Sequence, residues 1–153
     1  MSRIGLANTE NVAKLLNGYL ANLHVLYTKL HNFHWNIEGK EFFTLHAKLE
    51  ELYDGVASEI DEVAERILML GHRPAASMDD YLKAATLKEV PSEGIDGKSV
   101  VILVLADYEV LIRELRAAIK AAQDIEDEVS ADLLIGLLAK YEKNVWMLEA
   151  YLK

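Results

Sequence analysis

The chain of 153 residues contains no cysteine, only two prolines and eight glycines, and no long apolar run. The absence of cysteine excludes disulfides, thiolate metal sites and cysteine nucleophiles. The scarcity of proline and glycine favours long, uninterrupted secondary structure elements. A transmembrane helix needs about 20 apolar residues, and the longest run here, VVILVLA from Val100, is far shorter. The N-terminal MSRIGLANTENV has no apolar core of a secretory signal. We therefore expect a cytoplasmic protein that does not enter a membrane.

Positive charge is also scarce, because 16 lysines and arginines face 25 aspartates and glutamates. The formal net charge of −9 argues against general affinity for nucleic acid or anionic membranes, whose phosphates attract clustered cations. The same acidity suits the attraction of metal cations, and it equally suits solubility alone. Apolar residues make up 52% of the chain, which is enough to form a core, and the length predicts a single globular domain over residues 1–153.

Apolar residues recur at three- and four-residue spacing along most of the chain, which predicts helices. Gly39 and Gly71 interrupt this pattern, Thr9 stands where the first helix would be capped, and Ser77 begins a short capped helix. A long connection that carries this short helix predicts an all-α four-helix bundle with a crossover between the second and third long helices. The predicted long helices cover residues 9–37, 42–70, 98–122 and 129–152, with the short helix at 77–85 and an acidic joint at 123–128.

The predicted second helix has two opposed faces when its residues are placed at about 100° intervals. One face is an apolar stripe directed at the core of the bundle, and the other carries acidic residues and one histidine. The acidic side chains therefore point away from the core of their own bundle. The apolar face consists of Leu45, Leu49, Leu52, Val56, Ile60, Val63, Ile67 and Leu70, and the opposite face of His46, Glu50, Asp54, Asp61 and Glu65.

The side chains of the acidic face cannot all reach one metal ion within one chain. His46 and Glu50 lie one turn apart and can share a cluster, as can Asp61 and Glu65. About 22 Å of helix separates His46 from Asp61, whereas a metal ion holds its ligands within about 2.0–2.6 Å. An antiparallel pair of chains would join the two clusters, so an intersubunit metal site is one interpretation and an ordinary solvated acidic face is the other. No glutamate is followed three residues later by a histidine, which excludes the Glu-x-x-His di-iron arrangement inside a bundle.

The other histidines have mostly structural interpretations. His34 lies near the apolar stripe of the first helix, where a histidine is more often packed in the core than bound to metal. His24 and His31 are interpreted as structural or surface residues, and His72 is expected to be exposed after the helix stop. Trp35, beside His34, is either a packing residue or, at a redox metal centre, an oxidisable indole.

The stretch HNFHWNIEGKEFFTLHAKLEELYDGVASEIDEVAERILMLG resembles the signature of the Dps family, the mini-ferritins. That signature joins His-Trp-Asn, a glycine, an aromatic residue and Leu-His to a downstream Asp-x-x-Ala-Glu-Arg-Ile. The resemblance extends over nearly the whole chain, including the short helix and the C-terminal NVWMLEAYL. The matching residues are His34, Trp35, Asn36, Gly39, Phe43, Leu45, His46, Asp61, Ala64, Glu65, Arg66 and Ile67.

By this resemblance the protein would be a ferritin-like homo-oligomer, a dodecamer with metal sites at two-fold interfaces. It would oxidise Fe(II), preferentially with hydrogen peroxide and otherwise with oxygen, and store the ferric mineral in its cavity. Both reagents of hydroxyl-radical chemistry would then be removed, which protects against oxidative stress. Imidazole and carboxylate ligands suit iron, and zinc or manganese would fit the same ligands.

The resemblance also implies roles for individual residues. Glu50 stands where many family members have aspartate, so direct ligation and a water bridge both remain open. Trp35 and Lys48 would lie beside the ligands rather than among them. The implied metal ligands and catalytic residues are His34 and His46 from one subunit, Asp61 and Glu65 from its neighbour, and Glu50.

Acidic residues at the junction of the third and fourth long helices have two interpretations. Family members line three-fold pores with such residues, which makes Asp124, Glu128 and Asp132 candidate pore-lining residues for iron entry, with Asp127 the next candidate. Acids at the start of a helix also complement its dipole, so ordinary capping of the fourth helix is the alternative.

Two other functions remain alternatives. Some family members compact DNA with lysine-rich tails, but the segment before the first predicted helix offers only Arg3 and the terminal amine. DNA binding is therefore not expected, because phosphate contacts need clustered cations. A non-enzymatic bundle that only buffers metal would keep the same ligands without oxidising iron.

Overall fold

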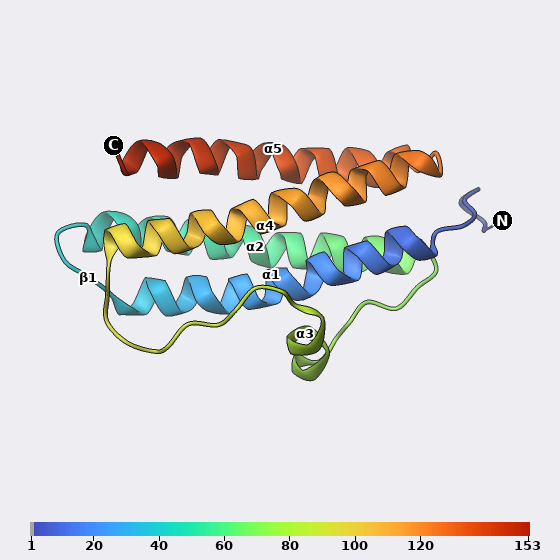
Figure 1. Cartoon of the computed structure of the whole chain (residues 1–153). Coiled ribbons are helices and arrows are strands. Elements are labelled where there is room, and N and C mark those ends of the chain that lie inside the picture. The colour runs from blue at the N-terminus through green and yellow to red at the C-terminus, as the bar shows by residue number, and fades with distance from the viewer. Residues whose placement is uncertain (1) are drawn as a thin grey trace.

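The computed structural model describes residues 2–153 and confirms the all-α, ferritin-like bundle (Figure 1). The first long helix packs mainly against the second, the third against the fourth, and the first also against the third. The connection from the second to the third long helix runs the length of the bundle, and its short helix lies against the first long helix (Figure 1). The helices are α1 (Glu10–Asn36), α2 (Phe42–Met69), α3 (Met78–Ala84), α4 (Gly97–Asp124) and α5 (Glu128–Tyr151).

Two short strands join the ends of the connections, which the helical periodicity did not predict. β1 (Ile37–Glu38) follows α1, and β2 (Ile95–Asp96) precedes α4. The two pair in parallel, with Ile37 opposite Ile95. A pair of two-residue strands leaves no period to detect in the sequence, although it anchors the long crossover to the end of α1.

The apolar stripe predicted on α2 forms part of the core. Seven of its eight residues are buried and Ile60 is partly buried. Each fully buried aliphatic side chain of this kind stabilises the fold by about 1.5–3 kcal/mol relative to exposure. The opposite face of α2 is thereby left to solvent or to a partner.

The start of α1 is joined to the end of α2 by side-chain hydrogen bonds, and the sequence predicted only part of this arrangement. Gly71 ends α2 as predicted, with φ +90°, and the N–H groups of Gly71 and His72 donate to Leu68 and Ile67. Thr9 is the N-cap residue of α1, as predicted, but its side chain makes no capping hydrogen bond. The Thr9 hydroxyl instead donates to the carbonyl of Leu70 at 3.2 Å and lies 2.9 Å from Nε2 of His72. His72 is therefore partly buried and bonded, not simply exposed.

A buried ion pair fastens the end of α2 to the start of α5. The Arg66 guanidinium donates to Asp127 at 2.9 Å and to the Ser130 hydroxyl at 2.8 Å. Asp127 also accepts from the main-chain N–H of Ser130 at 3.0 Å, so it caps α5. The sequence-based placement of Asp127 as the next candidate for a pore lining is therefore wrong, because its side chain is only 1% exposed and is held by Arg66.

We expect Asp127→Ala to lower the free energy of unfolding by about 3 kcal/mol, because it leaves the Arg66 charge buried without a partner. Thermal and urea unfolding at fixed protein concentration measure the loss. The matched control is Asp124→Ala, which removes an exposed ion pair with Lys120 and should cost less than about 1 kcal/mol. Equal losses in the two variants would show that the buried ion pair stabilises the fold no more than the exposed one does.

One carboxyl group lies inside the bundle. Glu59 of α2 is buried, and the Tyr141 hydroxyl of α5 donates to it at 2.5 Å. Burial raises the pKa of Glu59 to about 7, although the Tyr141 hydrogen bond and the charge of Lys140 oppose that rise. The folded protein therefore holds a proton on Glu59 at a pH where the unfolded chain has lost it.

Stability should consequently fall as pH rises from about 5 to 8, because the unfolded state releases the Glu59 proton first. We expect Glu59→Gln, which cannot ionise, to abolish about 2–3 kcal/mol of that fall. Urea unfolding at several pH values measures it. A wild-type profile and a variant profile that run parallel across this range would contradict the assignment.

Candidate metal centre

Two histidines meet where the end of α1 faces the start of α2. The Nδ1 atom of His34 lies 2.6 Å from the main-chain oxygen of His46, and Nδ1 of His46 lies 2.7 Å from the main-chain oxygen of His34. A carbonyl oxygen only accepts, so both Nδ1 atoms carry the proton. In its neutral form each ring therefore presents the lone pair of its Nε2, the form that a metal requires.

The packing around these rings fixes their orientation. The two imidazoles are stacked, with centroids 3.7 Å apart and planes 11° from parallel. Phe42 stacks on His46 at 4.8 Å, and Tyr53 meets the edge of His34 at 5.3 Å. His34 is buried and His46 is half-buried, so the pair is a preformed part of the fold and not a flexible surface feature.

The carboxylates predicted beside these histidines lie exposed along α2. Glu50 follows His46 by one turn, and Asp61 and Glu65 lie one turn from each other further along. None of the three forms an ion pair with a residue between Ser2 and Lys153. Each is therefore free to meet a cation.

The five predicted ligands do not come together within the chain. No group of three or more His, Asp or Glu side chains across residues 2–153 is arranged to hold a metal ion. The structure joins His34 to His46 and leaves Asp61 and Glu65 on distant turns of α2. A metal centre that used all five residues would therefore need a second copy of the chain, and a solvated acidic face remains the other interpretation.

Tyr53 is a member of this neighbourhood that the sequence analysis missed. Its hydroxyl donates to Glu50 at 3.4 Å, and its ring stacks on His31 at 3.8 Å. The signal in the sequence was its position three residues after Glu50, on the same side of the helix. Tyr53 thus contacts two candidate ligands: its hydroxyl donates to Glu50, and its ring packs against His34.

The remaining histidines have structural surroundings, as the sequence analysis proposed. Nδ1 of His31 lies 2.9 Å from the main-chain oxygen of Tyr27. His24 stacks on Tyr81 of α3 at 3.7 Å, and burial lowers the pKa of His24. Trp35 is 69% exposed, with its ring 5.3 Å from that of His31, so it does not pack into the core of this chain.

The acidic junction between α4 and α5 is shorter than predicted, because α4 continues to Asp124. Only residues 125–127 separate the two helices, and Glu126 adopts a positive φ of 60° to make the turn. Asp124 is paired with Lys120 at 3.2 Å. Glu128 and Asp132 are exposed.

Comparison with known proteins places these features in a family. The model of the ferritin-like domain matches residues 13–153. The DNA protection during starvation protein 2 of Bacillus anthracis is 44% identical over 94% of this chain and 97% of its own length. The corresponding protein of Brevibacillus brevis is 46% identical over 93% of this chain and 95% of its own length.

Solved structures agree. The Dps protein of Vibrio cholerae O1, described as a member of a broad superfamily of ferritin-like diiron-carboxylate proteins, superimposes with a TM-score of 0.96 and 42% identity over 100% of this chain and 97% of that one. Dps from Listeria innocua, in a crystal soaked with zinc, gives a TM-score of 0.89 at 33% identity over 92% of this chain and 95% of that one. From sequence, family model and fold together, this chain belongs to the Dps family of ferritin-like proteins.

Proposed function

We propose that this protein oxidises Fe(II) at sites shared between two copies of the chain and stores the ferric product inside a dodecameric shell. The observation that carries the proposal is the His34–His46 pair, whose two Nε2 lone pairs stand beside a face of α2 rich in unpaired carboxylates. Mixed imidazole and carboxylate donors are suited to iron. The family relationship supports the same reading.

The proposed ligands have different roles. His34 and His46 each offer one nitrogen donor in a fixed place, because their other ring nitrogens are bonded to main-chain oxygens. Asp61 and Glu65 of a second copy, facing the histidines across a two-fold axis, bring hard oxygen donors that favour the ferric product. Glu50, held by the Tyr53 hydroxyl, completes the set either directly or through a water molecule.

The reaction balances without any other reductant. Two Fe(II) ions each give up one electron. Hydrogen peroxide takes both electrons and two protons, its O–O bond breaks, and two water molecules form. Oxygen is the slower oxidant in this proposal. Ferric ions then hydrolyse and leave for the mineral, which frees the carboxylates for the next pair. Zinc and manganese(II) fit the same donor set and would act as competitors that cannot be mineralised in this way.

Complementation between variants tests the shared site. His46→Ala and Asp61→Ala should each abolish rapid Fe(II) oxidation, followed as ferric absorbance after peroxide is added to the anaerobic, iron-loaded protein. When the two variants are unfolded, mixed and refolded together, half of the two-fold pairs are mixed and one of the two sites in each is intact, so about a quarter of the wild-type activity should return.

The control for this experiment is Asp54→Ala, which removes another carboxylate from the same face of α2 and should leave the rate unchanged. Variants that each retain the wild-type rate would remove the proposed ligands. Inactive variants that reassemble together but stay inactive would contradict a site shared between two copies of the chain. A wild-type protein that binds iron but oxidises it no faster than buffer does would instead be a metal-buffering bundle.

Iron entry is assigned to the acidic residues near the α4–α5 junction. Asp124, Glu128 and Asp132 are exposed on adjoining turns, and rings of such carboxylates around a three-fold axis would attract Fe(II). Asp127 takes no part, because it pairs with Arg66.

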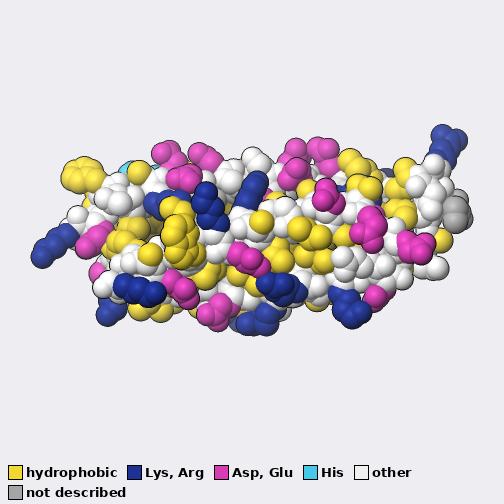
Figure 2. Space-filling view, turned by 90° about the horizontal axis from the view of Figure 1, so that it is seen from above, with side chains coloured by type: hydrophobic (Ala, Val, Ile, Leu, Met, Phe, Trp, Pro, Cys, Tyr) yellow, Lys and Arg dark blue, Asp and Glu magenta, His cyan; other side chains and the backbone are white. Residues whose placement is uncertain are grey.

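DNA compaction is not part of the proposed function. Figure 2 shows basic, acidic and apolar side chains interspersed over the described part of the face that contains α5, and the chain carries a formal charge of −9. We therefore expect no shifted complex with linear DNA in a gel at low salt, where electrostatic binding is strongest. A discrete shifted band containing the intact assembly would overturn this expectation.

A further inference from the structure

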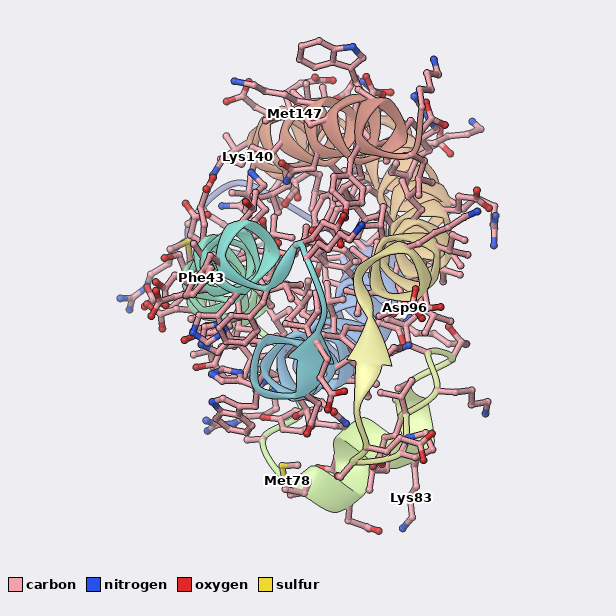
Figure 3. The ribbon with its side chains drawn as sticks, turned by 90° about the vertical axis from the view of Figure 1, so that its left-hand side faces the viewer. Phe43, Met78, Lys83, Asp96, Lys140 and Met147 are labelled. Atoms are coloured by element: carbon pink, nitrogen blue, oxygen red, sulfur yellow. The ribbon has the colours of Figure 1, made fainter. Side chains whose placement is uncertain are left out.

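A pocket of about 330 Å³ opens between α2 and α5, on a different face of α2 from the candidate metal ligands. These two helices are not among the closely packed helix pairs of residues 2–153, which leaves room between them. Gly55 contributes to the wall of the pocket, and a Cβ added there would meet no other atom within 4 Å. In Figure 3, which views the bundle from one end, Lys140 and Met147 lie on the flank of α5 above α2.

Three lysines line this pocket although the chain as a whole is acidic. Lys48 comes from α2, and Lys140 and Lys143 come from α5. Lys140 and Lys143 are three residues apart on one helix face, where two like charges repel each other. Neither forms an ion pair with any residue from Ser2 to Lys153. An anion placed between them would remove this repulsion.

The pocket also has polar groups that are buried and fixed. Its inner end is formed by Tyr108, Tyr141 and Glu59, each less than a tenth exposed. The Tyr141 hydroxyl is committed to Glu59. The inner end is therefore structurally defined by a hydrogen bond across the bundle, while the ammonium groups supply the charge nearer the opening.

One of the three lysines forms an ion pair with a surface carboxylate. Lys48 pairs with Glu51 at 3.2 Å, and the Glu51 side chain is 71% exposed. An exposed pair of this kind is weak, about 0–1 kcal/mol, so Lys48 can exchange Glu51 for a bound anion at little cost. The Asn144 side chain, which also lines the pocket, adds a neutral amide donor.

We propose that the pocket between α2 and α5 binds a small inorganic oxyanion of the phosphate type, held by Lys48, Lys140, Lys143 and Asn144. Tetrahedral oxyanions accept hydrogen bonds from several directions at once, and charge-assisted hydrogen bonds from ammonium groups are the strong kind. The pocket volume of about 330 Å³ suits a small free ion. The site uses none of the five proposed iron ligands, so it stands or falls independently of iron oxidation.

Binding of inorganic phosphate to the assembled, iron-free protein tests the proposal. Equilibrium dialysis at low ionic strength should show saturable binding, and sulfate should displace the phosphate whereas acetate at the same ionic strength should not. The double variant Lys140→Gln, Lys143→Gln should bind at least about tenfold more weakly, since it loses two charge-assisted hydrogen bonds. Glu51→Gln should bind more tightly, because it releases Lys48.

The matched control is the double variant Lys83→Gln, Lys120→Gln, which changes the net charge equally at two exposed lysines on α3 and α4. It should bind phosphate like the wild-type protein. Equal weakening in both double variants would reduce the effect to overall charge and overturn the site. Absence of saturable phosphate binding would also overturn it, as would saturable binding of Mn(II) lost in Glu51→Gln, which would make the pocket a cation site.

Discussion

The division of α2 into a core face and an acidic face constrains the rest of the structure. The same helix must bury its apolar stripe against the other helices and leave Glu50, Asp61 and Glu65 outside the bundle. A residue on an α-helix cannot change faces without a break, and α2 runs unbroken from Phe42 to Met69. The chain therefore cannot fold its acidic residues around a metal inside the bundle, and any site that uses them must lie at a surface where another copy can contribute.

The histidine pair complements this constraint because it lies where α1 ends and α2 begins. His34 lies in the last turn of α1 and His46 in the first turns of α2, so a short connection brings each imidazole within hydrogen-bond distance of the other residue's main-chain oxygen. Those hydrogen bonds serve two purposes. They close the turn between the helices, and they leave both Nε2 atoms as acceptors. The same two hydrogen bonds therefore stabilise the fold and orient the candidate metal ligands.

Periodicity and glycine positions predicted most of the fold, since helix lengths and the stop at Gly71 depend on local sequence. The details that failed depend on contacts between distant segments. Thr9 has the right position for a cap, but its hydroxyl found Leu70 and His72 instead. Asp127 reads equally as a pore residue or a cap until Arg66 is seen beside it. The joining of His34 to His46 involves main-chain oxygens, which carry no signature in the sequence.

The two kinds of ligand in the proposed centre differ in how firmly the protein holds them, and that difference suits a metal that passes through. The imidazoles are stacked and bonded to the main chain, so they would return to the same positions after each ion leaves. Asp61 and Glu65 are exposed and unpaired within the described chain, so they can follow an ion as its charge rises from two to three. A site with all ligands rigid would retain the ferric product, and one with none rigid would bind Fe(II) too weakly to oxidise it. Fixed nitrogen donors from one copy and mobile oxygen donors from another satisfy both requirements, which is a physical reason for sharing the centre between subunits.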